Sequence, residues 1–126
     1  MALSIANIDH IVLKVRDMER AISFYRDVLG CQVEREVESI GLVQMRAGVC
    51  MIDLVPREQN EPANDLDHFC VRIADWNEAA VLSELKSHGI DAPDPVSRYG
   101  AEGDGPSIYV NDPDGNVVEL KGPPFA

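Results

Sequence analysis

The sequence has only three cysteines in 126 residues, and several other signals are missing from it. Cys31, Cys50 and Cys70 are odd in number and form no Cys-x-x-Cys pair, which argues against a disulfide framework and indicates a reducing compartment. No apolar run is long enough to cross a bilayer, and the N-terminus lacks the charged-then-apolar pattern of a secretion signal. We therefore expect a cytoplasmic protein with no membrane partner.

Positive charge is also scarce, because 11 Lys and Arg residues stand against 22 Asp and Glu, for a net charge of −11. The sequence contains no basic patch, and a negative surface repels nucleic acids and anionic membranes. Both are excluded as expected partners. The composition, 45% apolar and 26% charged, is typical of a globular protein, and the length fits one domain.

The strongest positive signal is an internal repeat. Residues 8–15 return as residues 66–73, each copy continues into a helix-like stretch ending at Gly30 or Gly89, and each closes on a strand with a central carboxylate. A repeat of this length determines the architecture. It predicts a first module over about residues 6–57, a linker over 58–65 and a second module over about 66–122.

Each module is predicted to be β-α-β-β-β, which makes the fold class α+β. In the first, Asp17 caps the helix and strands cover 8–16, 31–38, 41–47 and 49–56. In the second, Asp75 caps the helix, and strands lie near 94–98, 107–111 and 116–121, with residues 99–106 as a glycine-rich loop. Neither module could bury a sheet face alone, so the two must pack together, within or between chains.

Strand alternation brings four possible metal ligands to equivalent positions. Ile11, Leu13 and Val15 form the apolar set expected beneath the helices, so His10 faces the other way. The same logic places His68, Asp53 and Glu119 on the concave faces opposite the helices. Two imidazoles and two carboxylates suit Zn²⁺, Ni²⁺, Co²⁺, Mn²⁺ or Fe²⁺, and two His with one carboxylate would suit non-haem Fe²⁺ and oxygen chemistry.

Substrate contacts are predicted from cations near these ligands. Lys14, Arg72 and Lys121 lie on the ligand faces, and Arg57, Arg98 and Tyr99 flank the expected rim. We expect at least one of them to contact a substrate carboxylate or phosphate. Residues 100–105 are a candidate lid, Cys70 and Tyr109 are candidate cavity-lining residues, and His88 is expected to be an exposed helix-end residue and not a ligand.

Several motifs together resemble the vicinal oxygen chelate superfamily, which includes glyoxalase I, methylmalonyl-CoA epimerase, fosfomycin-resistance proteins and extradiol dioxygenases. They are Asp9-His10, the helix segment 21–30 with its Phe-Tyr-x-x-x-Leu-Gly pattern, Asp67-His68, and the Asp-Pro-x-Gly-x-x-x-Glu pattern within residues 112–120. The resemblance spans about residues 6–122. It implies paired modules forming an incomplete barrel around a concave site, with metal ligands at His10, Asp53, His68 and Glu119. It also implies a homodimer, in which the site can be shared between chains.

The resemblance implies chelation of two neighbouring substrate oxygens by a metal that polarises a carbonyl and stabilises an enediolate. Glu119 is then the expected catalytic base, with Asp53 as the alternate. A glyoxalase I-like enzyme normally has Glu where this chain has Asp53, which could bind through water or leave a position open. The leading hypothesis is a glyoxalase-type lyase or isomerase acting on a small molecule. The alternatives are an Fe-dependent extradiol-type dioxygenase using His10, His68 and Glu119, a metal-free drug-binding protein of the bleomycin-resistance kind, and, as a lesser variant, thiol transfer to fosfomycin.

Overall fold

The computed structural model describes residues 6–61, 66 and 68–126. The chain divides into two compact units, Met1–Asn64 and Asp65–Ala126, which we call unit 1 and unit 2. The division falls within the predicted linker, whose residues 62–65 lie outside the described residues, as does Asp67. Among the residues described, no helix combines the length and the apolar composition that a membrane span requires.

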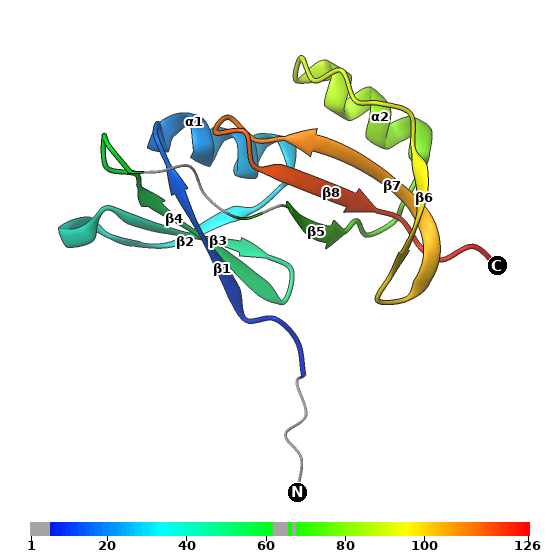
Figure 1. The fold of residues 1–126 in the computed structure, drawn as a ribbon, viewed down its shortest axis with the longest axis horizontal. Helices are drawn as coiled ribbons and strands as arrows, with labels where there is room; N and C mark the ends of the chain where they lie inside the picture. Colours follow the sequence, from blue (N-terminus) through cyan, green and yellow to red (C-terminus); the bar gives the residue numbers. More distant parts are fainter. Residues whose placement is uncertain (1–5, 62–65, 67) are drawn as a thin grey trace, which may run out of the picture. The chain divides into compact units, whose positions relative to one another are not determined.

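Unit 1 contains one four-stranded sheet with the order β1-β4-β3-β2 (Figure 1). Its elements are β1 (His10–Val15), α1 (Met18–Ser23), a π-helical turn η1 (Phe24–Val28), β2 (Gln32–Val37), a short η2 (Glu38–Ile40), β3 (Leu42–Ala47) and β4 (Cys50–Pro56). β1 pairs in parallel with β4, and the other pairs are antiparallel. The first strand of the module, β1, therefore lies at an edge of the sheet, and the last strand, β4, lies beside it in the interior.

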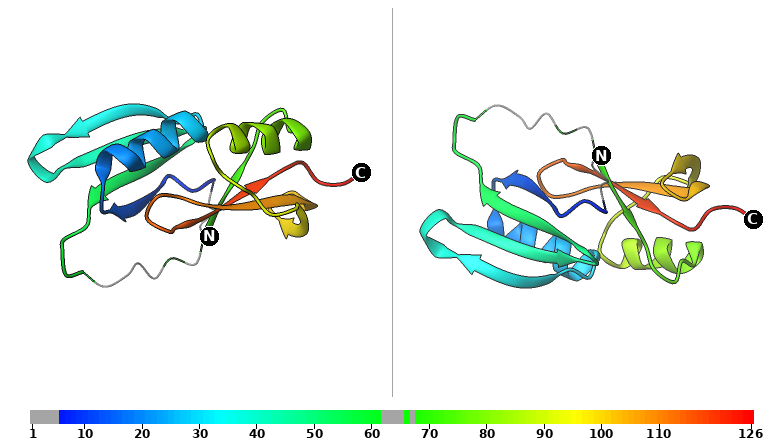
Figure 2. Two further views of the ribbon diagram at one scale, coloured as in Figure 1. Left: turned by 90° about the horizontal axis from the view of Figure 1, so that it is seen from above. Right: turned by 90° about the horizontal axis from the view of Figure 1, so that it is seen from below.

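Unit 2 repeats this arrangement with the sheet order β5-β8-β7-β6. Its elements are β5 (His68–Arg72), α2 (Glu78–Ser87), β6 (Val96–Gly100), β7 (Gly103–Asn111) and β8 (Val117–Lys121), and β5 pairs in parallel with β8. The two further views show each unit as a twisted sheet with its own helix (Figure 2). The predicted α+β class and the β-α-β-β-β order of both modules are confirmed.

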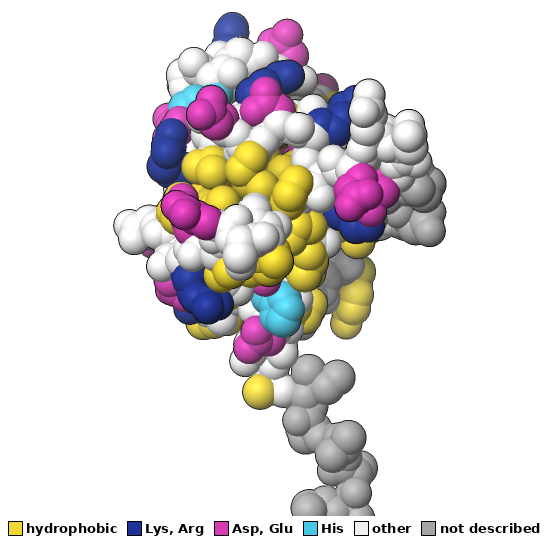
Figure 3. Space-filling model, turned by 90° about the vertical axis from the view of Figure 1, so that its left-hand side faces the viewer, with side chains coloured by type: hydrophobic (Ala, Val, Ile, Leu, Met, Phe, Trp, Pro, Cys, Tyr) yellow, Lys and Arg dark blue, Asp and Glu magenta, His cyan; other side chains and the backbone are white. Residues whose placement is uncertain are grey.

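The apolar side chains of each unit separate from the candidate ligands as strand alternation requires. In β1, Leu13 and Val15 are buried, whereas His10, Val12 and Lys14 are exposed. In β8, Val118 and Leu120 are buried on the face opposite Glu119. On the molecular face drawn in Figure 3, basic side chains are scattered among acidic ones instead of gathering into a patch.

The start of the second helix was predicted wrongly. Asp17 caps α1 as expected, its side chain accepting from the backbone N–H of Arg20. Asp75, however, lies before the helix with a φ of 50°, and Asn77 is the cap, accepting from the N–H of Ala80 at 3.0 Å. The chain makes a turn after β5 before the helix begins, and Asn and Asp are equally good caps, so composition alone did not separate the two sites.

The glycine-rich segment 99–106 is not the predicted loop. Tyr99 and Gly100 end β6, β7 begins at Gly103, and only Ala101 and Glu102 form the turn between them. Gly103 has a φ of 112°, which side-chain-bearing residues rarely adopt. Glycine is depleted in strands, so the composition favoured a loop where the chain forms a tight hairpin. The candidate lid is therefore a hairpin tip.

Candidate functional site

Unit 1 brings His10 and Asp53 to one face of its sheet. In the parallel β1–β4 pair, His10 lies opposite Met51 and Val12 lies opposite Asp53, so the imidazole and the carboxylate are diagonal neighbours. Asp53 is 6% exposed, whereas about half of the His10 side chain is exposed. The apolar residue between them, Val12, is open to solvent. The imidazole of the pair is therefore open to solvent, whereas the carboxylate is buried.

Each member of this pair has a fixed polar neighbour. Asp9 Oδ1 lies 2.8 Å from His10 Nδ1, and this hydrogen bond, with the charge of Asp53 added to it, raises the pKa of His10. An imidazole held by a carboxylate at Nδ1 presents Nε2 for coordination, as is typical of metal-binding histidines. Gln44 Nε2 donates to both oxygens of Asp53, at 3.3 and 3.2 Å, and Arg35 holds the Gln44 carbonyl oxygen at 3.3 Å.

Unit 2 brings its own histidine and carboxylate together. His68 Nε2 lies 3.4 Å from Glu119 Oε1, and Glu119 is 6% exposed. Ser107 donates its hydroxyl to Glu119 Oε2 at 2.7 Å, and Tyr109 donates to Oε1 at 3.1 Å. Both hydroxyls come from β7, which pairs with β8 and places Tyr109 directly opposite Glu119.

These neighbours keep Glu119 ionised although it is buried. Burial acts to raise the pKa of Glu119, but the hydrogen bonds from Ser107 and Tyr109 and the charge of His68 outweigh it, and the pKa lies below its ordinary value. Partial desolvation of the Cys70 thiol, with the nearby Glu119 carboxylate, raises the pKa of Cys70 to about 11, although solvent still reaches this side chain. The result is a negative carboxylate beside an unionised thiol.

The spacing of the His68–Glu119 pair fits two ligands of one metal ion. Ligand atoms about 2.1 Å from an ion and separated by the tetrahedral angle lie about 3.4 Å apart. The observed Nε2–Oε1 distance is 3.4 Å. Within the described ranges, no group of three or more His, Cys, Asp or Glu side chains is spaced to hold a metal. Each unit thus contributes one imidazole and one carboxylate to the predicted set of four.

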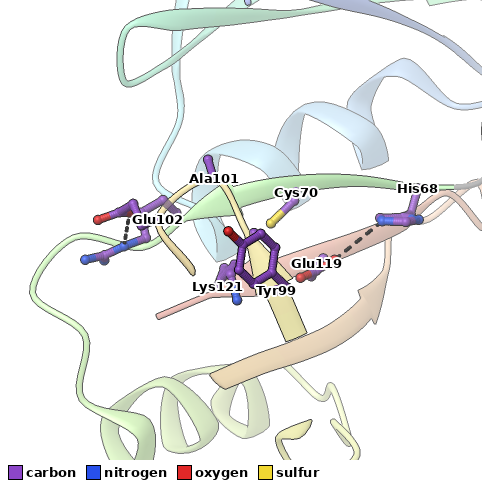
Figure 4. Close-up of a pocket in the computed structure, with 9 residues that line it drawn as sticks. His68, Cys70, Tyr99, Ala101, Glu102, Glu119 and Lys121 are labelled. Carbon is purple, nitrogen blue, oxygen red and sulfur yellow. Dashed lines mark hydrogen bonds and ion pairs between the residues drawn. The ribbon is translucent and has the colours of Figure 1, made fainter. Parts of the chain in front are cut away.

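Beside the unit 2 pair lies a cavity of about 330 Å³, lined mainly by β5, β8 and the β6–β7 hairpin. Its polar lining includes His68, Arg72, Glu102, Glu119 and Lys121, most of which Figure 4 labels. Arg72 Nε lies 2.9 Å from Glu102 Oε1. A cavity of this size, lined by the candidate metal ligands His68 and Glu119 and by a few other charged groups, is typical of a small-molecule binding site.

Lys121 differs from the other predicted substrate cations because it is buried. It is 6% exposed, and its Nζ donates to the carbonyl oxygens of Arg98 at 2.6 Å and Gly105 at 3.3 Å. The chain passes close by at Gly100, where a Cβ would come within 2.4 Å of Lys121 Cε. Lys121 therefore lines the cavity and also links β8 to the β6–β7 hairpin.

The remaining predicted residues are divided between the two units. Lys14 lies in unit 1 and pairs with Glu61 at 2.7 Å, and Arg57 follows β4 in the same unit. In unit 2, the Arg98 guanidinium lies 5.9 Å from the centre of the Tyr109 ring, and Tyr99 is 82% exposed at the cavity. His88 is the C-cap of α2 and lies 3.2 Å from Glu84, in agreement with its predicted place at the helix end.

Sequence reasoning missed three residues that shape these sites: Ser107, Gln44 and Glu102. Alternation along the strand at 107–111 contained the signal for Ser107, since it shares a face with Tyr109. Gln44 faces Asp53 because β3 pairs with β4 in a register that places the two opposite each other. Glu102 carried no signal, because its position depends on a hairpin whose glycine content predicts a loop.

Comparison with known proteins gives one family. Residues 7–120 match the family model of the Glyoxalase/Bleomycin resistance protein/Dioxygenase superfamily. The virulence protein STM3117 of Salmonella typhimurium is 32% identical over 122 residues, which are 92% of this chain and 83% of that protein. Its crystal structure superposes with a TM-score of 0.80 at 31% identity, covering 96% of this chain and 99% of that one.

Two further relatives have names that describe reactions. The mitochondrial methylmalonyl-CoA epimerase of Mus musculus is 29% identical over 133 residues, covering 93% of this chain and 73% of that protein. The structure of a lactoylglutathione lyase from Agrobacterium tumefaciens has a TM-score of 0.71 at 25% identity, covering 94% of this chain and 95% of that one. The family match covers nearly the whole of both predicted modules, so the resemblance seen in the sequence is confirmed.

Proposed function

Since this chain belongs to the glyoxalase/bleomycin resistance protein/dioxygenase superfamily, we propose that it is a metal-dependent lyase or isomerase of small molecules. Its substrate would carry two neighbouring oxygens, and the reaction would move a proton at the adjacent carbon. The observation that carries the proposal is the His68–Glu119 pair, in which a buried carboxylate lies 3.4 Å from an imidazole nitrogen. The relatives named as an epimerase and a lyase support it.

The proposed ligands are His10 and Asp53 from unit 1 and His68 and Glu119 from unit 2. The imidazole and carboxylate donors suit a divalent ion such as Zn²⁺, Ni²⁺, Co²⁺, Mn²⁺ or Fe²⁺. When bound, such an ion supplies Lewis-acid polarisation of the substrate oxygens. Asp9 orients the His10 ring for this role. We further propose that the protein is a cytoplasmic homodimer. The four ligands would come either from one chain or from the two chains of the dimer.

Glu119 is the better of the two candidate bases because of what surrounds it. A base must be stable both as an anion and after it has taken up a proton. The hydroxyls of Ser107 and Tyr109 donate to the Glu119 anion, and a hydroxyl can also rotate to accept a hydrogen bond from the protonated acid. The lowered pKa of Glu119 keeps it in the anionic form that a base requires at neutral pH, although it also makes the carboxylate a weaker base.

Asp53 has the opposite surroundings. Its two oxygens face the Nε2 amide of Gln44, which can only donate, and Arg35 holds the Gln44 amide in that orientation through its carbonyl oxygen. The Gln44 amide therefore offers no acceptor to a proton on Asp53. These contacts suit a carboxylate that stays charged and supports the ion, while Glu119 moves the proton.

The test combines metal content with a variant of the base. We expect about one divalent ion per chain in protein purified without chelator, lost in a His68→Ala/Asp53→Ala variant. Glu119→Gln should lower metal-dependent exchange of the carbon-bound proton of methylmalonyl-CoA, or turnover of lactoylglutathione, by about 10²–10⁴-fold. Glu84→Gln, on the exposed face of α2, is the control. Full activity of Glu119→Gln, or no metal after reconstitution, would refute the proposal.

A second candidate is an Fe-dependent extradiol-type dioxygenase, and one observation favours it. Because Gln44 engages both oxygens of Asp53, that carboxylate can be withheld from the ion. His10, His68 and Glu119 would then form the two-His, one-carboxylate arrangement of non-haem iron oxygenases. Oxygen uptake with a catechol in the Fe²⁺-loaded protein, with no proton exchange under nitrogen, would select this function over the first.

A further inference from the structure

The unit 2 cavity contains a second charged pair at the end away from the candidate metal ligands. Arg72 lies four residues beyond His68 on β5, on the same face, so their Cα atoms are about 13 Å apart. Arg72 Nε is 2.9 Å from the carboxylate of Glu102. Figure 4 shows Glu102, the partner of Arg72, at one end of the cavity and His68 at the other, with Cys70, Tyr99 and Lys121 between them.

Without a metal ion, the positive and negative charges of the side chains that line the cavity cancel. Arg72 and Lys121 are cations, and Glu102 and Glu119 are carboxylates. Lys121 is held by two backbone carbonyls and is buried, so its charge cannot be screened by water. A divalent ion at His68 and Glu119 would leave an excess of two positive charges, or of one if Asp53 also binds the ion as proposed. The loaded cavity would then favour an anionic substrate.

Glu102 is placed where a ligand carboxylate could take its position. It lies in the two-residue turn between β6 and β7, and its side chain is 53% exposed, against 40% for Arg72. An ion pair this exposed contributes little to stability, so breaking it is easy. Arginine binds carboxylates through two parallel hydrogen bonds, which a free ligand can adopt more readily than the tethered Glu102.

We propose that Arg72 binds an anionic group of the substrate and that Glu102 occupies this position until substrate displaces it. The substrates are accordingly small acids, with two neighbouring oxygens at one end and a carboxylate at the other. Arg72 determines this specificity although its Cα atom lies about 13 Å along β5 from that of the candidate ligand His68. The inference rests on the proposed function, because it takes His68 and Glu119 as the end of the cavity that binds the ion.

The experiment uses matched pairs of 2-oxo acids, whose neighbouring oxygens can chelate an ion. 2-Oxoglutarate and 2-oxoadipate carry a terminal carboxylate, and 2-oxopentanoate and 2-oxohexanoate carry a methyl group in its place. Calorimetric titration of the metal-loaded full chain should show binding about 10-fold tighter for the acids with the terminal carboxylate. Arg72→Gln should abolish this preference and leave the binding of 2-oxopentanoate and of the metal itself unchanged.

Glu102→Gln should have the opposite effect, tightening 2-oxoglutarate binding while leaving 2-oxopentanoate unaffected. The controls are Arg26→Gln, which breaks an arginine–carboxylate pair in unit 1, and Glu84→Gln on α2. Metal-dependent binding without any preference for the terminal carboxylate, or a preference that survives Arg72→Gln, overturns the inference alone. No binding of any 2-oxo acid to the loaded protein also overturns it. Failure to bind metal overturns the proposed function as well.

Discussion

Replacing Ser107 by alanine tests the buried hydrogen bonds on which the assignment of Glu119 depends. Ser107 is fully buried, and its hydroxyl donates to Glu119 Oε2 at 2.7 Å. A hydrogen bond to a charged group contributes about 1.5–3 kcal/mol, and its loss leaves a buried carboxylate with fewer donors. We expect Ser107→Ala to lower the free energy of unfolding of the protein by this amount at pH 7.

The pH dependence of this loss distinguishes the hydrogen bond from simple packing. Because the pKa of Glu119 in the folded protein is lowered from its ordinary value of 4.5, its ionised form stabilises the fold above that value. This contribution disappears as the pH falls through the lowered pKa. Ser107→Ala raises the pKa of Glu119, so the difference between variant and wild type should be largest at pH 7 and shrink below pH 4.5.

Urea unfolding followed by tryptophan fluorescence measures the loss of stability with a probe that lies in unit 2, the unit that contains Ser107. The single tryptophan, Trp76, packs over Gly122 directly after β8. With an m-value of about 1–3 kcal/mol per molar urea, the expected loss shifts the midpoint by about 1 M. Ser83→Ala, at an exposed position of α2, should change stability by less than about 0.5 kcal/mol. A loss of equal size at pH 7 and at a pH below the lowered pKa of Glu119 would refute the electrostatic explanation.

Three further predictions follow from the same contacts. Because Asp9 raises the pKa of His10, protons compete for this ligand, and calorimetry should show metal affinity at least about 10-fold lower at pH 6 than at pH 8. With a pKa of about 11, Cys70 of the metal-free protein should react with iodoacetamide about 10²-fold more slowly at pH 8 than a free thiol does. Peptide mass spectrometry measures this rate, and Glu119→Gln should increase it because the Glu119 carboxylate helps to raise the pKa of Cys70. In Gly100→Ala, the added Cβ would clash with Lys121 Cε, so the lysine would have to shift and lose its hydrogen bonds to Arg98 and Gly105; we expect a loss of about 1–3 kcal/mol in urea unfolding. The double variant Gly100→Ala/Lys121→Ala should lose less stability than the sum of the two single variants, because removal of the Lys121 side chain also removes the clash.

The sequence predicted what depends on periodicity. The repeat indicated two equivalent modules, and alternation along β1 and β8 separated Leu13 and Leu120 in the core from His10 and Glu119 on the other face. These predictions succeed because a strand has only two faces, and burial of one set of side chains selects between them.

What depends on register and turn geometry could not be predicted in the same way. The partners of Asp53 and Glu119 come from the neighbouring strands β3 and β7, whose alignment is determined by pairing that a single sequence does not show. The glycines in the strands that flank Ala101 and Glu102 predict a loop where the chain forms a hairpin. The Arg72–Glu102 pair was missed with it.

The difference between the two carboxylates gives a last prediction, on the length of the side chain at position 53. Gln44 already approaches both oxygens of Asp53, at 3.2 and 3.3 Å. One added methylene in Asp53→Glu would carry the carboxylate past the amide and further from the sheet. If Asp53 is withheld from the ion by Gln44, Asp53→Glu should tighten metal binding in a competition titration with a chelating dye. Glu119→Asp, which shortens the other carboxylate, should weaken it.

The opposite result would identify Asp53 as a direct ligand of the correct length. In that case Asp53→Glu would bind metal more weakly than the wild type, and Gln44→Leu would change the affinity by removing two hydrogen bonds to a coordinated carboxylate. Tighter binding in Asp53→Glu instead favours an ion with an open position in this chain, because the shorter aspartate holds its charge near the site while leaving a coordination position for the substrate oxygens.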